Sequence, residues 1–412
     1  MVSVWDDLTG QPEAIRIFRA AAAGSGGAGS RAAVDGAAGD DAATDGAGSG
    51  RSGDSSSMTH SWLITGPPGS GRSNLAYAFA TALLSPGTPE GDRLTKKQVD
   101  ARTHPDLGVL STERVIISRA EVRALLAASQ FSPSVSRFRV MVIEDADRMT
   151  EITSNVLLKA LEEPPERTVW ILCAPSEADL LPTIRSRVRS VRLRVPSVDE
   201  VAALIERRDG VDPAIALRAA REAQSHIGMA HRLATSAEAR SRREETLRVA
   251  LGIGSVAGAV EAATRLLAIA TDDAKAITVE RDAEERESAL RSLGVQQGGP
   301  VPAALRSQLR SLEEDQKRRA TRSLRDGLDR ILVDLQSLYR DILLFQLDAP
   351  VETVNAAIQP ELEEAARAAG PVESLATLDA IALARTRIDA NVSPALSLEA
   401  MLISAIRKGS AL

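Results

Sequence analysis

Short apolar runs alternate with longer segments of helical composition between residues 59 and 174. The short runs predict buried strands, and the longer segments, which contain few helix breakers, predict helices. Such alternation is typical of a parallel α/β sheet. The expected elements, in chain order, are strand 62–65, helix 73–84, strand 107–110, helix 119–130, strand 138–143, helix 151–163 and strand 169–174.

Local signals mark two of the expected helix boundaries. Ser118 and Glu121 form a capping-box pattern at the start of the second helix. The pair Pro164-Pro165 ends the third helix, because proline cannot donate a backbone hydrogen bond and clashes with the preceding turn.

The pattern changes after Pro196, where the chain becomes almost wholly helical. At 412 residues the length favours about three domains. A loop is expected at 294–302, and the charge-dense run 313–330 is expected to be a solvated helix face. The expected domains are an α/β domain at 1–195, a small helical domain at 196–240 and a larger helical bundle at 241–412.

A tract near the N-terminus lacks the residues that build a core. Residues 20–57 are mainly Gly, Ala, Ser and Asp with almost no large apolar side chains. Such a segment cannot bury enough surface to fold, so we expect a disordered insert there. A short loop and helix over residues 5–23 is expected to precede it, and the ordered fold should resume near residue 59.

Composition excludes several classes of protein. The net charge of −6 argues against an autonomous, strongly cationic nucleic-acid binder, and an aromatic content of 2% argues against a base-stacking platform. Cys173 is the single cysteine, which excludes a disulfide framework and fits a reducing cytoplasm. It lies in an apolar run, so we expect a buried core thiol. We expect neither a membrane helix nor a signal peptide.

The segment between the first strand and the first helix reads GPPGSGRS. It matches the phosphate-binding loop G-x-x-x-x-G-K-[ST] except that arginine replaces lysine. A strand, a glycine turn and a helix start together aim backbone N–H groups at an anion. The candidate binding residues are Gly66, Pro67, Pro68, Gly69, Ser70, Gly71, Arg72 and Ser73.

The arginine leaves two interpretations open. Lysine places a compact charge between the β- and γ-phosphates, whereas a guanidinium group is a broad planar fork with a different reach. In one interpretation the loop still binds ATP or ADP, with Ser73 supplying a hydroxyl to Mg²⁺ and with poor alignment of the γ-phosphate. In the other, the loop survives only as a tight turn between strand and helix.

Two acids follow the strand expected at 138–143. An ATPase of this type needs an aspartate that holds the metal ion through water, followed by a glutamate that orients the attacking water. Here the order is reversed, because Glu144 comes first and Asp145 second. Together with Arg72, this reversal predicts a weakened or absent ATPase.

Arginines recur in the segment after the last expected strand, at positions 185, 187, 189, 192 and 194. They are consistent with a basic edge that meets DNA phosphates or with a solvated strand edge. Arg187 has a third interpretation as a finger that reaches into a neighbouring subunit's nucleotide site. Such a finger stabilises transferring phosphoryl charge and contributes about 10³–10⁵ in rate.

Four motifs occur in the order seen in bacterial clamp-loader AAA+ subunits, and the chain resembles that family. The most specific is NVLLKALEEPP at 155–165, which is similar to a helix of the family almost residue for residue. The resemblance covers approximately residues 4–20 and 59–235. The other three motifs are GPPGSGR at 66–72, the acidic strand end at 144–147 and TIRSR at 183–187.

The resemblance implies an AAA+ P-loop domain, a helical lid domain and a helical collar that assembles a hetero-pentamer. It implies the clamp-loader delta and gamma/tau subunits as partners, and the sliding clamp and primer–template DNA as partners of the assembly. Arg187 matches the finger of the family's Ser-Arg-Cys motif, with Val188 in place of the cysteine. Arg232 lies where the family's second sensor helix begins, and it would contact a phosphate or pack on the lid surface.

The chain departs from the family in one respect that concerns metal. Family members carry a four-cysteine zinc module before a His-Pro-Asp segment. Residues 103–106 keep Thr-His-Pro-Asp, but residues 85–102 contain no cysteine. We therefore expect no zinc site of that design.

Two functions remain open. The favoured one is a clamp-loader component with little ATPase of its own, which gives Arg187 to a neighbouring ATPase and helps to load the sliding clamp onto primed DNA during chromosomal replication. The alternative is a catalytically active AAA+ ATPase of replication or repair, similar to gamma/tau, that tolerates Arg72.

Overall fold

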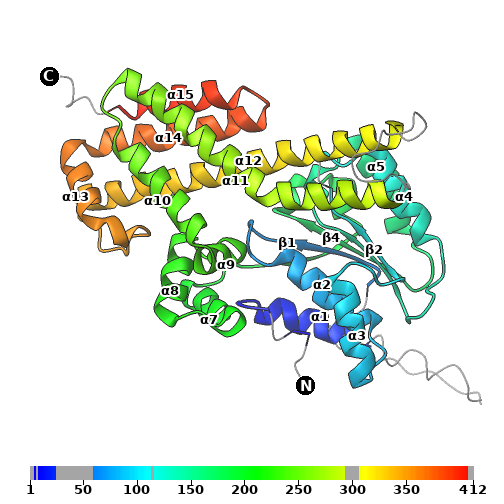
Figure 1. The fold of residues 1–412 in the computed structure, drawn as a ribbon. Helices are drawn as coiled ribbons and strands as arrows, with labels where there is room; N and C mark the ends of the chain where they lie inside the picture. Colours follow the sequence, from blue (N-terminus) through cyan, green and yellow to red (C-terminus); the bar gives the residue numbers. More distant parts are fainter. Residues whose placement is uncertain (1–3, 6–7, 25–58, 113–115, 293–305, 407–412) are drawn as a thin grey trace, which may run out of the picture. The chain divides into compact units, whose positions relative to one another are not determined.

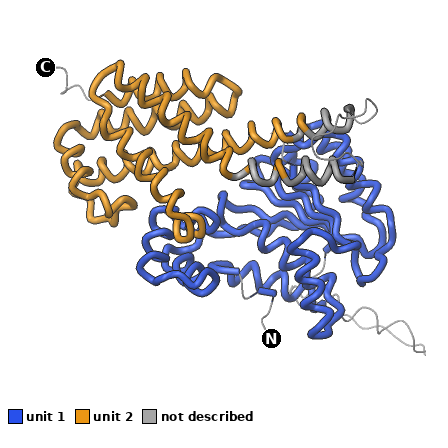
Figure 2. Tube along the Cα trace, in the orientation of Figure 1, with its two compact units in different colours: residues 1–112, 116–230 blue, residues 113–115, 231–412 orange. Residues whose placement is uncertain are grey.

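The computed structural model describes residues 4–5, 8–24, 59–112, 116–292 and 306–406. The chain forms two compact units, the first comprising residues 1–112 and 116–230 and the second residues 231–412 (Figure 2). The finer division into three domains, with boundaries at 195 and 240, stays a prediction.

The first unit contains a five-stranded sheet of order β2-β3-β4-β1-β5, in which every pairing is parallel. The predicted parallel α/β sheet is confirmed. Because β4 lies between β1 and β3, the loops that follow β1 and β3 flank β4 at the carboxyl edge of the sheet, where such folds bind ligands. The strands are β1 Ser61–Thr65, β2 Leu107–Leu110, β3 Arg139–Ile143, β4 Thr168–Ala174 and β5 Arg189–Arg192.

Helices cover both faces of this sheet (Figure 1). On one face, Trp62 packs against Phe18 and Phe79, with ring centroids 4.5–5.6 Å apart. On the other face, Leu63 and Met141 belong to a separate buried cluster. The helices are α1 Pro12–Gly24 and α2 Arg72–Leu84 on the first face, α4 Arg119–Ser129, α5 Glu151–Glu162 and α6 Pro182–Arg185 on the second, and α3 Pro89–Asp100, α7 Val198–Asp209 and α8 Pro213–Glu222.

The structure confirms the capping box at Ser118 and corrects two expectations. Helix α1 continues to Gly24, so the first residues of the expected insert are helical, and residues 25–58 lie outside the described part. Helix α3 was not expected. Thr88 caps it by accepting a hydrogen bond from the Gly91 N–H, and it occupies the segment that would carry the zinc-binding cysteines in the family.

In the second unit, the described residues form helices packed around one buried cluster. The loop expected at 294–302 lies outside the described residues. The charged run 313–330 is part of α12, but Arg319 and Leu328 are buried, so this run packs as well as faces solvent. The helices are α10 Ala237–Leu251, α11 Val256–Ser292, α12 Arg306–Gln346, α13 Gln359–Ala368, α14 Pro371–Asp389 and α15 Pro394–Ser404, and α9 Ile227–Thr235 crosses the boundary between the units.

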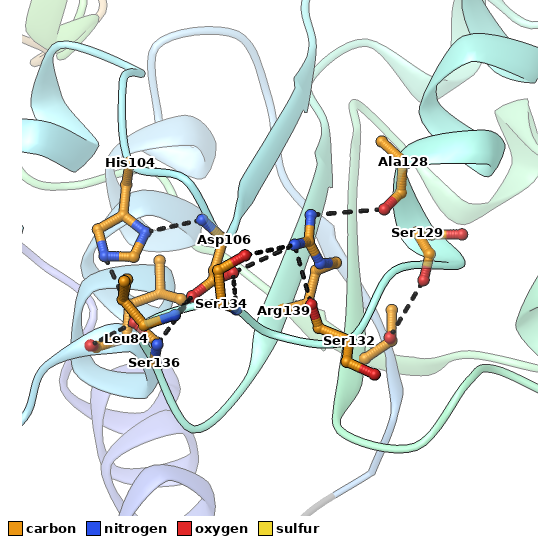
Figure 3. A network of polar contacts seen from close by, with 11 residues as sticks. Leu84, His104, Asp106, Ala128, Ser129, Ser132, Ser134, Ser136 and Arg139 are labelled. Carbon is orange, nitrogen blue, oxygen red and sulfur yellow. Dashed lines mark hydrogen bonds and ion pairs between the residues drawn. The ribbon is translucent and has the colours of Figure 1, made fainter.

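A buried polar network joins the start of β2 to the loop before β3 (Figure 3). The fully buried Asp106 carboxylate lies 3.2 Å from the Arg139 guanidinium. It also accepts hydrogen bonds of 2.5–2.8 Å from the backbone N–H groups of Ser134, Val135 and Ser136. Burial alone would raise the pKa of Asp106, but these donors outweigh it and hold the pKa below its ordinary value.

His104 belongs to the same network. Its Nδ1 accepts a hydrogen bond from the Asp106 N–H at 3.1 Å, and its Nε2 faces the Ser136 hydroxyl at 3.4 Å. Burial lowers the pKa of His104, so the neutral imidazole is favoured. In the part of the chain that the structure describes, no group of three or more His, Cys, Asp or Glu side chains could hold a metal ion.

Candidate functional site

The phosphate-type loop connects β1 to α2 at the carboxyl edge of the sheet. Gly69 and Gly71 adopt φ angles of +78° and +90°, which glycine tolerates without strain. Gly71 is the N-cap of α2, and its carbonyl accepts the first helical hydrogen bond, from Leu75 N–H, at 2.9 Å. The loop therefore has the strand–turn–helix geometry that its sequence predicts.

Arg72 does not project away from the loop. Its Nη1 donates a hydrogen bond of 2.9 Å to the carbonyl oxygen of Gly66, the first residue of the same loop. A lysine at this position would present its charge to the β- and γ-phosphates. Here the guanidinium closes the loop on itself instead.

Residues from elsewhere in the first unit cover the tip of the loop. The His226 ring lies so close that a Cβ added at Gly69 would be 2.3 Å from its Cγ. The Ile227 N–H also donates to the Gly69 carbonyl at 3.3 Å. On another side, Gln11 Nε2 lies 3.4 Å from the Ser70 carbonyl.

A small hollow lies between these covering residues and the loop. Leu8, Gln11, Ser70 and Ile227 contribute to its lining, and its volume is about 10 Å³. That is room for about one water molecule, whereas ligand pockets usually measure ~300–1,000 Å³. This hollow therefore has no space for a nucleoside.

We predict that Gly69→Ala lowers the free energy of unfolding of the first unit by about 2–5 kcal/mol. The left-handed backbone costs a side-chain-bearing residue about 1–2 kcal/mol, and overpacking against His226 adds about 1–3 kcal/mol. Denaturant unfolding of the full chain, followed by tryptophan fluorescence, measures the change, because Trp5, Trp62 and Trp170 all belong to this unit.

Gly87→Ala is the matched control, since Gly87 has a φ of +83° but nothing within 4 Å of an added Cβ. It should show only the backbone cost, and His226→Ala should rescue part of the Gly69→Ala loss. Equal losses in the two glycine variants would contradict the contact between His226 and the loop.

Glu144, the first of the paired acids, follows β3 and is almost surrounded by donors. Its Oε1 accepts hydrogen bonds from the Tyr77 hydroxyl and from Arg102 Nη2, the latter at 2.7 Å. Its Oε2 accepts a hydrogen bond from the Ser111 hydroxyl at 3.0 Å. Burial and the hydrogen bond to Glu144 raise the pKa of Tyr77, so its hydroxyl stays a donor.

Asp145 and Cys173 lie near Glu144, and a role of Asp145 in nucleotide binding stays a prediction. The Asp145 carboxylate lies 3.8 Å from Arg148 Nε. Cys173 is fully buried in β4, and burial raises the pKa of its thiol to about 12. This burial confirms the prediction of a buried core thiol. A protonated, enclosed thiol is a poor nucleophile.

The residues of this site do not fit a magnesium nucleotide as they are arranged. Arg72 is bonded to the loop, and both oxygens of Glu144 already accept hydrogen bonds. No hydrolytic step follows from this geometry. Binding of ATP or ADP with Mg²⁺ stays a prediction from the sequence.

Arg187 lies between α6 and β5, in a segment of the same unit. Its Nε donates to Glu162 at the end of α5 at 2.6 Å, and its Nη1 donates to the Thr183 carbonyl at 2.8 Å. The Arg187 side chain is 31% exposed and that of Glu162 is 45% exposed, so water reaches the pair. An exposed ion pair of this kind contributes only about 0–1 kcal/mol.

Three other arginines contact groups of this chain. The guanidinium carbon of Arg189 lies 5.1 Å from the centroid of the Trp62 ring, and Arg194 forms an ion pair with Glu200. Arg232, the candidate second-sensor residue, forms an ion pair with Asp273 in the second unit. The structure therefore favours packing over phosphate contact for Arg232.

Sequence reasoning missed the partners that decide the state of this site. Tyr77, Arg102 and Ser111 around Glu144 carry no motif, and nothing in the pattern around them indicates a common target. Glu162 lies within the recognised 155–165 motif, but its pairing with Arg187 was not predicted.

Among the described helices, none is both long and apolar enough to cross a membrane.

Comparison with known proteins identifies similar chains. The family model described as DNA polymerase III, delta subunit, matches residues 51–197. That range contains the phosphate-type loop, Glu144, Asp145 and Arg187.

Similar curated proteins include both gamma/tau and delta' subunits. The gamma/tau subunit of DNA polymerase III from Mycobacterium tuberculosis is 27% identical over 173 residues, which are 37% of this chain and 28% of that protein. The delta' subunit from Pseudomonas aeruginosa is 34% identical over 134 residues, 31% of this chain and 41% of that protein. The chain thus spans less than half the length of these relatives.

A solved structure with the same kind of name is also similar. A gamma subunit-related protein from Thermotoga maritima is 18% identical, covers 84% of this chain and 94% of its own, and superimposes with a TM-score of 0.40. Identity and coverage at these levels do not separate the delta' from the gamma/tau type.

Proposed function

We propose that this chain is a subunit of the DNA polymerase III clamp loader, and that it acts there as the delta-prime subunit, with little or no ATP hydrolysis of its own. In this role it forms a hetero-pentamer with delta and gamma/tau subunits in the cytoplasm. The assembly then loads the sliding clamp onto primer–template DNA.

One contrast carries the proposal. The Arg72 and Glu144 side chains are bonded to other groups of this chain, which supports a site with little or no nucleotide hydrolysis. Arg187, in contrast, is partly exposed on a segment that matches the family's finger motif. Side chains of the phosphate-type loop and of the acidic pair are occupied, whereas Arg187 is partly exposed. This contrast supports a subunit that assists ATP hydrolysis by a neighbouring subunit.

The chemistry assigned to Arg187 follows from its guanidinium group. A planar fork of donors can bind two oxygens of a transferring phosphoryl group and offset the charge that develops there. The pair with Glu162 is weak enough to exchange, because an exposed ion pair contributes only about 0–1 kcal/mol. We therefore propose that Glu162 holds the finger until a neighbouring nucleotide replaces it.

ATP turnover by the isolated chain and clamp loading by the reconstituted complex test the proposal. We expect the isolated chain to hydrolyse ATP at background rate, and Arg72→Ala and Asp145→Asn to change nothing. A complex of delta, gamma/tau and this chain should load the clamp onto primed DNA, and a complex without the chain should not. Robust turnover by the isolated chain, lost in either variant, would instead identify an active ATPase similar to gamma/tau.

A further inference from the structure

Three segments that are far apart in the sequence converge on the Glu144 carboxylate. Tyr77 comes from α2, Arg102 from the segment after α3, and Ser111 from the segment after β2. The Glu144 side chain is only 13% exposed, so its charge is largely removed from water. A carboxylate in that position needs a counter-charge as well as hydrogen bonds.

Arg102 supplies the counter-charge. Its Nη2 lies 2.7 Å from Glu144 Oε1, and its guanidinium carbon lies 5.5 Å from the centroid of the Tyr77 ring. The backbone of Arg102 has a φ of +58°, a left-handed conformation that costs a side-chain-bearing residue about 1–2 kcal/mol. A strained residue of this kind persists only where its surroundings hold it in place.

A divalent metal ion and this guanidinium would compete for the same carboxylate. In an active P-loop ATPase the corresponding acid takes part in holding Mg²⁺, and the ion is the largest local charge in such a site. A guanidinium in contact with that acid repels an approaching cation. The Glu144 carboxylate therefore binds either the Arg102 guanidinium or a divalent metal ion.

We propose that Arg102 is a resident cation of this site, which neutralises Glu144 in the place of a divalent metal ion. The inference deepens the proposed function and rests on it for the statement that this site is not a motor. It gives a reason for weak metal binding that the altered loop alone does not provide. The chain itself supplies a positive charge at the carboxylate that binds a metal ion in an ATPase.

The surrounding space makes the inference testable. Ser73, Tyr77, Lys96, Arg102 and Arg208 contribute to the lining of a cleft of about 440 Å³. Replacing Arg102 by a neutral residue would leave Tyr77 and Ser111 on Glu144 but remove the positive charge, and it would do so at the wall of an open cleft. A small hydrated cation would then meet less repulsion near the Glu144 carboxylate.

Mn²⁺, which replaces Mg²⁺ in oxygen-ligand sites and is visible by electron paramagnetic resonance, is the probe. In titrations of the full chain, we expect Arg102→Gln to bind Mn²⁺ at least about tenfold more tightly than the wild type, because a repelling charge has been removed. Adding Glu144→Gln to that variant should abolish the gain. Arg102→Lys, which keeps the charge, should behave as the wild type.

Arg208→Gln is the matched control, since Arg208 lines the same cleft but pairs with Asp209. It should leave Mn²⁺ binding unchanged. Equal Mn²⁺ affinity in wild type and Arg102→Gln would overturn the proposal. So would a wild-type chain whose Mn²⁺ binding is lost in Glu144→Gln, an outcome that does not depend on how well Arg102→Gln folds.

ATP turnover in the same samples separates the two ideas. If Arg102→Gln gains no Mn²⁺ site while the wild-type chain still fails to hydrolyse ATP, the proposal that Arg102 replaces a metal ion is wrong and the proposed function stands. If the wild-type chain hydrolyses ATP with Mg²⁺, the proposed function itself fails.

Discussion

Replacing Arg187 by alanine is expected to slow ATP hydrolysis in the reconstituted clamp loader about 10³-fold at the site that receives the finger. The substitution removes a planar cation that would stabilise charge on the transferring phosphoryl group. Single-turnover hydrolysis in the presence of clamp and primed DNA measures the effect. Clamp loading should fall with it.

Two variants control this experiment. Arg185→Ala removes an exposed arginine two residues away and should leave the rate unchanged. Glu162→Gln releases Arg187 from its partner and should also preserve hydrolysis, because the exposed pair contributes little. Unchanged hydrolysis and loading in Arg187→Ala would rule out the finger.

The largest effect on stability is expected for Asp106→Ala, which should lower the free energy of unfolding of the first unit by about 3–5 kcal/mol. The substitution leaves the Arg139 guanidinium buried without its carboxylate, and three backbone N–H groups lose their acceptor. Denaturant unfolding of the full chain, followed by tryptophan fluorescence, measures the change.

Asp100→Ala is the control for the same experiment. Asp100 forms an ion pair with Lys96 one helical turn away, and both side chains are well exposed. Its removal should cost about 0–1 kcal/mol. Similar losses for Asp100→Ala and Asp106→Ala would show that the buried network does not hold the start of β2 to the loop before β3.

The strands and helices of the first unit could be predicted because their signals are local. Fully buried runs such as Thr168–Ala174 stand out from their surroundings whatever they pair with. The helix Pro89–Asp100 was missed because most of its residues are polar and only Thr95 and Val99 are buried along it. Its start depends instead on a cap at Thr88 followed by proline.

The candidate site could be predicted only as a set of residue types. The sequence shows that Arg72 replaces lysine and that the acids are reversed, but it does not show where these side chains point. Tyr77 lies 67 residues from Glu144, Arg102 lies 42 and Ser111 lies 33. Contacts over such separations depend on how several segments pack, and no local pattern records them.

The amino-acid sequence alone therefore determined the parallel α/β sheet, the strand–loop–helix at Gly66–Ser73 and the departures from an active ATPase, because these depend on residue type and short-range periodicity. Only the tertiary structure decided that Arg72 bonds to Gly66, that Glu144 is paired with Arg102, and that Arg187 is held at an exposed position by Glu162. The reason is physical. Packing brings charged side chains from distant segments together, and the ion pairs and hydrogen bonds that they form depend on that packing.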